Sequence, residues 1–225
     1  MDILKIKLGY YTSILVLLSI STFAICFFAL FSINPVFEWT SLEAYVAYNQ
    51  TYDQSLRYAA QASMIVLAIC LLVLIALLDD RVEQEYKFFS KLSLHFMGIC
   101  TTLLCIGYFL QLTTVRWNYE NSTLDGLEHF IQFYPNSAVL AIIMSGYTLF
   151  LGLASFRLLP LLQNTPNMKL LRWGFWINGL SCMLGLIGFV FQILPLILYA
   201  TNIGNGIGLS LLGIGFLSFF NRIEK

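Results

Sequence analysis

The stretch Gly107-Tyr-Phe-Leu-Gln-Leu-Thr-Thr-Val-Arg116 decides the fold, because a long apolar run ends there and polar sequence follows. The chain continues through Asp125-Gly-Leu-Glu-His129 and becomes apolar again after Tyr134-Pro135. An apolar run that turns polar and aromatic and then resumes is typical of a chain that leaves a membrane and enters it again. This stretch also carries the densest group of reactive side chains expected on one side of the protein, namely Gln111, Arg116, Asp125, Glu128 and His129.

The composition of the whole chain indicates an integral membrane protein. Of its 225 residues, 59% are hydrophobic and 11% are charged, and the mean hydropathy is +0.79. Soluble domains carry about 25% charged residues, and a membrane-spanning helix needs about 20 apolar residues. The sequence therefore predicts an all-α membrane protein, a single domain over residues 1–225, with six transmembrane helices at about 9–32, 58–78, 92–113, 137–156, 173–199 and 203–220.

The distribution of Lys and Arg predicts the orientation of these helices. Ten of the twelve lie in segments that share a side with both termini, whereas Arg57 and Arg116 lie on the opposite side. Positively charged loops stay on the cytoplasmic side, so both termini are predicted to be cytoplasmic and the two long loops to face outward. The formal net charge of zero leaves no basic patch for a nucleic acid, so the expected partners are membrane lipids.

Each long outer loop is predicted to contain a short interfacial helix. In the first loop, Thr40-Ser-Leu-Glu43 resembles a capping box, with aromatic residues after it that suit the headgroup region. In the second, Leu124, Leu127 and Ile131 would share one face of an amphipathic helix over residues 123–133.

The third and fifth predicted helices share a seven-residue pattern. Ile106-Gly-Tyr-Phe-Leu-Gln-Leu112 matches Ile187-Gly-Phe-Val-Phe-Gln-Ile193, which places Gln111 and Gln192 at similar depth. A glutamine that faced hydrocarbon would leave its amide without hydrogen-bond partners. Both side chains are therefore predicted to face the bundle and to share one polar pocket, which Arg116 or Gln61 closes from above.

A polar stripe on the fifth helix extends this hypothesis, because Asn178, Ser181, Gly185, Gly188 and Gln192 recur at steps of three and four. Two alternatives remain open for the stripe: helix packing alone, or the lining of a cavity that opens outward. For the cavity, the candidate ligand-binding residues are Gln61, Gln111, Arg116, Asn178 and Gln192.

The sixth predicted helix is rich in glycine, and Gly204-x-x-x-Gly208 would permit close approach of another helix. That helix could come from the same chain or from another membrane protein. No metal site or cofactor is expected. All five cysteines fall inside apolar runs, and the two histidines, His95 and His129, lie toward opposite sides of the membrane.

Asp125, Glu128 and His129 form the one acid–base cluster in the sequence. On a helix, Asp125 and His129 lie four residues apart and can pair, whereas the adjacent Glu128 and His129 point in different directions. The two alternatives are an ordinary solvated surface and a catalytic group that acts on lipid headgroups.

Four pieces of the sequence resemble a set of small bacterial six-helix membrane proteins of unknown function. They are Gly107-Tyr-Phe-Leu-Gln-Leu-Thr-Thr-Val115, Asp125-Gly-Leu127, Gln132-Phe-Tyr-Pro135 and Gly146-Tyr-Thr-Leu-Phe-Leu-Gly-Leu-Ala154. The resemblance implies a protein of the bacterial cytoplasmic membrane, and it implies no activity.

The sequence leads to three functional hypotheses. The first is a non-enzymatic protein that binds a lipid-like or small apolar ligand in an outward-facing cavity, in transport or sensing. The second is a membrane-embedded enzyme that acts on lipids through His129. The third is a structural subunit of a larger membrane complex.

Overall fold

A computed structural model describes residues 2–162 and 168–224 of the chain, and every regular element within them is helical. Six helical segments are long and apolar enough to cross a membrane, which confirms the predicted fold class. They run over Ile3–Ile33, Ser55–Asp79, Gln84–Glu120, Ala138–Leu162, Lys169–Val190 and Leu194–Arg222.

Three of the six spans are single α-helices, and three are built from several helical pieces. The single ones are α1 (Ile3–Ile33), α3 (Ser55–Asp79) and α8 (Lys169–Val190). The third span contains η1 (Gln84–Tyr86), α4 (Lys87–Leu110), the π-helix η2 (Gln111–Val115) and α5 (Arg116–Glu120). The fourth contains α6 (Ala138–Met144), the π-helix η4 (Ser145–Phe150) and α7 (Leu151–Leu162), and the sixth contains α9 (Leu194–Leu198), the π-helix η6 (Tyr199–Gly204) and α10 (Asn205–Glu224).

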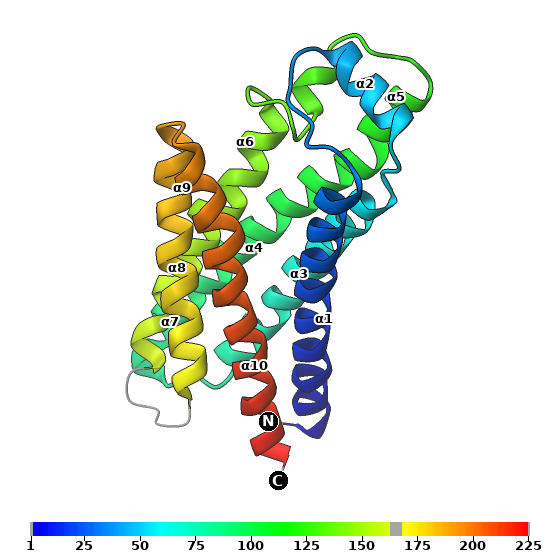
Figure 1. The fold of residues 1–225 in the computed structure, drawn as a ribbon. Coiled ribbons are helices and arrows are strands. Elements are labelled where there is room, and N and C mark those ends of the chain that lie inside the picture. The colour runs from blue at the N-terminus through cyan, green and yellow to red at the C-terminus, as the bar shows by residue number, and fades with distance from the viewer. Residues whose placement is uncertain (1, 163–167, 225) are drawn as a thin grey trace.

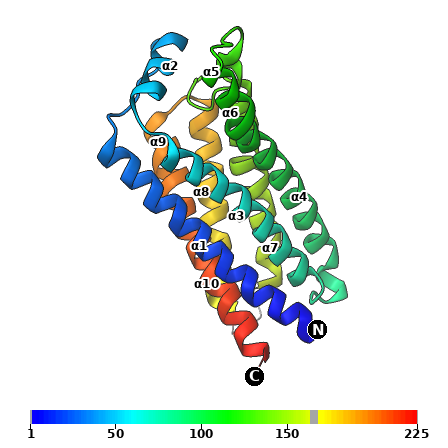
Figure 2. The same cartoon turned by 90° about the vertical axis from the view of Figure 1, so that its right-hand side faces the viewer.

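The six spans form a closed ring in which each packs against the next one along the chain. α1 packs against α3, α3 against α4, α4 against α7, α7 against α8 and α8 against α10, and α10 closes the ring on α1. Both termini lie at one end of this bundle, called here the terminal end, and α2 (Leu42–Thr51) lies at the other, called the α2 end (Figures 1 and 2).

Glycines bring α1 and α10 into close contact in the terminal half of the bundle. A methyl group added at Gly9 would meet the Phe220 ring at 2.4 Å, and one added at Gly213 would meet Leu17 at 2.6 Å. The neighbouring core is filled by large side chains that are completely or almost completely buried, including Leu74, Leu158, Phe175, Phe216 and Phe220. This half therefore has the dense packing of a protein interior.

The two long loops pack against each other and form a small cap at the α2 end. Tyr45, Val115, Leu127 and Ile131 are its buried core, and the rings of Trp39 and Tyr134 pack in a tilted arrangement at its edge with centroids 4.8 Å apart. The expected helix of the first loop is present as α2, and Ser41 is its N-cap residue, because its hydroxyl accepts a hydrogen bond from the Ala44 N–H.

The prediction of an amphipathic helix over residues 123–133 is wrong. Only the four-residue 3-10 helix η3 (Leu127–Phe130) forms there, after Gly126 in the left-handed conformation. The predicted apolar residues Leu124, Leu127 and Ile131 are nevertheless covered, because they pack against α2 and α5 within the cap.

The predicted boundary between the fifth and sixth spans is also wrong. α8 ends at Val190, and Gln192 adopts a positive φ of 56°. The Ile193 N–H donates to the Gly188 carbonyl and the Gln192 N–H to the Phe189 carbonyl, which is the hydrogen-bond pattern of a Schellman C-cap. Pro195 then lies in the first turn of α9, where its missing N–H costs nothing. The sixth span is consequently longer than predicted, and Gln192 lies in a turn.

Candidate functional site

An apolar groove separates α1 from the sixth span in the α2 half of the bundle. The helices touch at Leu17 and Gly213, but beyond that contact they diverge toward the α2 end (Figure 1). The space between them has a volume of about 360 Å³ and is called here the lateral groove. Phe28, Tyr199 and Ile203 line it and are 69%, 67% and 54% exposed, so the groove opens sideways on the lipid-facing surface.

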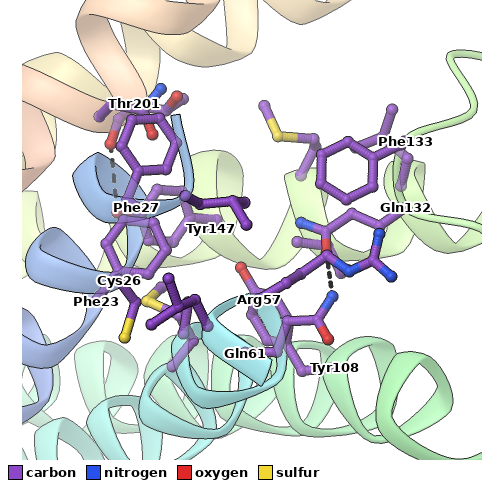
Figure 3. Close-up of a pocket in the computed structure, with 18 of the residues that line it drawn as sticks. Phe23, Cys26, Phe27, Arg57, Gln61, Tyr108, Gln132, Phe133, Tyr147 and Thr201 are labelled. Atoms are coloured by element: carbon purple, nitrogen blue, oxygen red, sulfur yellow. Dashed lines mark hydrogen bonds between the residues drawn. The ribbon is translucent and has the colours of Figure 1, made fainter. Parts of the chain in front are cut away.

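A second space, the inner cavity, adjoins the lateral groove and lies within the bundle. Its volume is about 200 Å³, and it lies between α1, α3, α4, α6, η4, η6 and the loop that carries Gln132 (Figure 3). Residues that line both spaces include Phe23, Phe27, Phe31, Met64 and Tyr147. The shared lining places the two spaces side by side, on either side of the same aromatic side chains.

An aromatic ladder on α1 forms a wall that both spaces share. Phe23, Phe27 and Phe31 follow one another at intervals of four residues, so all three lie on one face of the helix. Ring centroids are 5.8 Å apart for Phe23 and Phe27 and 4.7 Å apart for Phe27 and Phe31. This wall suits an extended hydrocarbon chain, because it offers a long apolar surface without hydrogen-bonding groups.

Two π-helical segments also contribute to the wall of the inner cavity. Tyr147 of η4 and Thr201 of η6 both line the inner cavity, and the Tyr147 hydroxyl donates a hydrogen bond of 3.3 Å to the Thr201 carbonyl. π-Helical turns are rare, and they occur frequently at functional sites. Here they contribute to the wall of the cavity from the fourth and the sixth spans.

Arg57 is the charged residue of the inner cavity and is only 7% exposed. It lies in the first turn of α3, and its guanidinium donates a hydrogen bond to the Asn49 side chain on α2. The guanidinium carbon lies 5.6 Å from the Tyr45 ring centroid, 5.5 Å from that of Tyr58 and 5.6 Å from that of Phe133. Burial raises the pKa of the Tyr45 hydroxyl above its ordinary value, and the nearby charge of Arg57 opposes that rise.

Three glutamines form a hydrogen-bonded chain beside Arg57. Gln111 is 4% exposed; its amide nitrogen donates to the Phe130 carbonyl at 2.5 Å, and its amide oxygen accepts from the Gln132 N–H at 3.0 Å. Gln111 thereby fixes the loop that presents Gln132 to the inner cavity. The Gln132 side chain in turn accepts a hydrogen bond of 3.1 Å from Gln61 (Figure 3). The Gln61 amide oxygen is buried and has no hydrogen-bond partner among the described residues.

Of the candidate residues, Gln61 lines the inner cavity, and Gln111 and Arg116 lie close to it. Gln61, Gln111 and Arg116 lie around Tyr58, and the gap between them is too small to hold a water molecule. The Arg116 side chain is 46% exposed, is paired with Glu120 at 2.8 Å, and lies 5.2 Å from the Tyr58 ring centroid. It therefore covers the outer side of the Tyr58 ring, while Arg57 lies over the same ring from within the protein.

Gln192 and Asn178 lie elsewhere, so the predicted pocket shared by Gln111 and Gln192 is wrong. Gln192 is exposed in the turn after α8, and the glycines of the repeated pattern pack against other helices. A methyl group at Gly107 would meet Ile143 of α6, and one at Gly188 would meet Ile197 of α9. Asn178 is completely buried and donates a 2.8 Å hydrogen bond to the Ser155 hydroxyl, at the packing interface of α8 with α7.

The glycine-rich face of the sixth span is used mainly inside the protein. Methyl groups at Gly204 and Gly208 would meet Ser181 and Asn178 of α8, and one at Gly213 would meet α1. Gly206 is different, because it lines the lateral groove and nothing lies within 4 Å of the position where a Cβ would be.

Asp125, Glu128 and His129 lie on the surface of the cap, and the predicted pairing is wrong. The closest carboxylate oxygen to His129 belongs to Glu128 at 3.8 Å, because η3 is a 3-10 turn and not an α-helix. The His129 side chain is 63% exposed, and none of the three residues lines the inner cavity. In the described parts of the chain, no group of three or more His, Cys, Asp or Glu could hold a metal ion.

Sequence reasoning missed Arg57 and Gln132 as cavity residues. Arg57 stood out only as one of two cations on its side of the chain, and no sequence signal marked it as unpaired, because Asp53 lies four residues before it. In the structure, Asp53 accepts hydrogen bonds from Ser55 and forms no ion pair with Arg57. No pattern in the sequence identified Gln132 either. It reaches the cavity only because the Gln111 side chain forms hydrogen bonds with the backbone of its loop.

Comparisons with known proteins do not identify a function, so the functional argument rests on the geometry of the site. No family model matches the chain, and searches of curated proteins and of solved structures found no match.

Proposed function

We propose that this multi-spanning membrane protein binds a lipid-like ligand, with its chain in the lateral groove and its polar end in the inner cavity. The observation that supports the proposal is that the two spaces adjoin each other, share a wall of aromatic residues and differ in polarity. The groove is apolar and opens toward lipid, whereas the inner cavity adds Arg57, Gln61 and Gln132. Such a division into an apolar lining and a few polar groups is typical of ligand sites.

The orientation of the site is part of the same proposal. With Lys and Arg concentrated at the terminal end, the α2 end faces outward and the inner cavity lies in the outer half of the membrane. The ligand then comes from the outer leaflet, sideways between α1 and the sixth span.

A lateral route from the membrane supports a lipid over a water-soluble ligand. The groove is bordered by exposed apolar side chains, among them Phe28 and Ile203, and α1 is the span with the smallest buried share. A hydrocarbon chain lying there would exchange lipid contacts for protein contacts and would not need to cross water.

Native mass spectrometry of the purified full-length protein tests the proposal. We expect one lipid molecule to stay bound after mild detergent extraction. Gly206→Trp should abolish this retention, because the indole would fill the lateral groove, where a Cβ has open space. Gly98→Trp is the matched control, since Gly98 is also helical and has open space, but it faces a different surface on α4.

Two results would overturn the proposal. One is a wild-type protein that retains no lipid under conditions that preserve its fold. The other is equal lipid retention by Gly206→Trp and Gly98→Trp, because a ligand elsewhere on the surface would be insensitive to the groove.

A further inference from the structure

The charge of Arg57 has no counterion within the described parts of the protein. The ion pairs found there are Lys5 with Asp80, Lys87 with Asp79, Arg116 with Glu120 and His129 with Glu128, and none of them includes Arg57. Buried charges are ordinarily paired, because taking an unpaired ion out of water is costly. An arginine residue that is only 7% exposed, lines a cavity and has no counterion therefore points to a partner that comes from outside the chain.

From this geometry we infer that the ligand is an anionic lipid, whose headgroup oxygens bind Arg57 while its hydrocarbon chain lies in the lateral groove. The inference rests on the proposed function, and it adds the chemical class of the ligand. Guanidinium groups suit phosphate and carboxylate oxygens, because their N–H groups form a planar fork that can donate two parallel hydrogen bonds.

The surroundings of Arg57 hold the guanidinium in place without neutralising it. Its protein hydrogen bond goes to the neutral Asn49 side chain, and its other neighbours are the faces of Tyr45, Tyr58 and Phe133. Aromatic faces attract a cation but carry no net charge. The positive potential in the inner cavity is therefore strong, because low-polarity walls screen it poorly.

Gln61 adds a neutral polar side chain to the wall of the same cavity. It lies four residues after Arg57, on the same face of α3, and is 6% exposed. Its amide oxygen lacks a partner, whereas its amide nitrogen is held by Gln132. Because the amide oxygen is shielded from the cavity, an anionic headgroup would bind Arg57 beside the hydrogen bond between Gln61 and Gln132.

Arg116 provides an internal comparison for this assignment. Both arginines lie over the Tyr58 ring, at 5.5 Å for Arg57 and 5.2 Å for Arg116. Arg116 is exposed and has Glu120 as its partner, so its charge is already balanced. Since the cavity lining contains no carboxylate, it also offers nothing to the cationic part of a zwitterionic headgroup.

Binding of single-chain lipids that differ only in their headgroup tests the inference. The purified full-length protein in a neutral detergent would be titrated with lysophosphatidylglycerol, lysophosphatidylcholine and monoacylglycerol of equal chain length, with bound lipid followed by native mass spectrometry. We expect the anionic lipid to bind at least about tenfold more tightly than the other two, as charge-assisted hydrogen bonds predict. Arg57→Gln should remove this preference, Arg57→Lys should keep part of it, and Arg116→Gln should keep it fully.

The outcomes separate this inference from the proposed function. If none of the three lipids binds the wild-type protein, the proposed function itself fails. If all three bind with equal affinity, or if Arg57→Gln keeps the preference for the anionic lipid, only the anionic headgroup is refuted. Glycerol phosphate without a chain should not compete; displacement of the lipid by it at similar concentration would show a site for free anions. The wild-type titration decides the question even if a variant does not fold.

Discussion

Lys87 at the terminal end and Arg57 at the α2 end are both largely buried cations, but their surroundings differ. The Lys87 ammonium lies 2.9 Å from the Asp79 carboxylate and also donates to the Asp79 carbonyl. Arg57 is buried among aromatic rings, with Asn49 as its protein hydrogen-bond partner. One end of the bundle therefore balances its buried charge internally, and the other leaves it facing a cavity.

The two ends also differ in packing, because the terminal end is filled by side chains and the α2 end contains a groove. At the terminal end, glycines draw α1 and α10 together, and phenylalanines fill the space between the helices. At the α2 end the same two spans diverge, and π-helical turns and the lateral groove occupy the corresponding region. The comparison teaches that dense packing and the proposed binding site belong to different halves of this protein, so substitutions in each half should have separable effects.

The largest expected effect on stability comes from the filled half. Phe216 is completely buried between Phe175 and Phe220, with ring centroids 6.1 and 6.4 Å away. Phe216→Ala should lower the free energy of unfolding by about 3 kcal/mol or more, because it removes many contacts and leaves a cavity. Denaturant unfolding in detergent measures this. Phe27→Ala, in the aromatic ladder, should cost clearly less stability but weaken lipid retention; equal losses of stability would contradict the division into halves.

A carboxylate placed beside Arg57 should give this arginine an internal counterion, as Lys87 has in Asp79 at the terminal end. Gln61→Glu puts an acid four residues after Arg57, where the two side chains can pair. We expect the affinity for an anionic lipid to fall about tenfold or more, because the charge is then balanced within the protein. Gln192→Glu is the control, since it makes the same change in an exposed turn at the same end. An unchanged affinity in Gln61→Glu would show that the charge of Arg57 does not attract the ligand.

Removing the internal partner of Lys87 should have a moderate effect. Asp79→Asn should lower the free energy of unfolding by about 1 kcal/mol, less than a fully buried pair would cost, because the Asp79 carbonyl still accepts from Lys87. Lipid binding should not change, since this pair lies at the other end of the bundle. Thermal unfolding and the lipid titration, carried out on the same preparation, would reveal any coupling between the two ends.

The smallest expected effect concerns the exposed pair of Lys5 and Asp80. Lys5 holds the pKa of the Asp80 carboxyl below its ordinary value. A carboxyl whose pKa is lower in the folded state stabilises the protein above its unfolded pKa of about 3.9, and that stability is lost as the pH falls through the folded value. Because the pair is exposed, Asp80→Asn should change stability by less than about 0.5 kcal/mol at pH 7. Melting temperatures of both proteins between neutral and acidic pH should converge below the folded pKa; a constant difference would argue against the pair.

The six spans were predictable from the sequence because an apolar run of about 20 residues is long enough to cross a bilayer and too hydrophobic for a helix that faces water. The boundary at Gln192 was not, because the left-handed C-cap is occupied by glutamine and not by the usual glycine; Pro195 was the remaining signal. The helix predicted in the second long loop was wrong for a different reason. Its apolar residues have helical spacing, but they are buried against α2 and α5, which sequence periodicity cannot foresee.

The site was predictable only in part. Gln111 and Gln61 were identified because an amide in a membrane span needs partners, and both lie at the α2 end beside the cavity. The roles differ from expectation, since Gln111 has both ends of its amide satisfied and clamps a loop. Arg57, Gln132 and the aromatic ladder of α1 come together from separate segments, so their proximity depends on how α1, α3 and the second loop pack together.

An experimental structure of the protein in a lipid environment would test the central claim most directly. We expect elongated density that begins in the lateral groove, passes the Phe23 to Phe31 ladder, and ends within hydrogen-bonding distance of the Arg57 guanidinium. An inner cavity closed by protein side chains, with Arg57 turned to water or paired with a carboxylate of the chain, would contradict the claim.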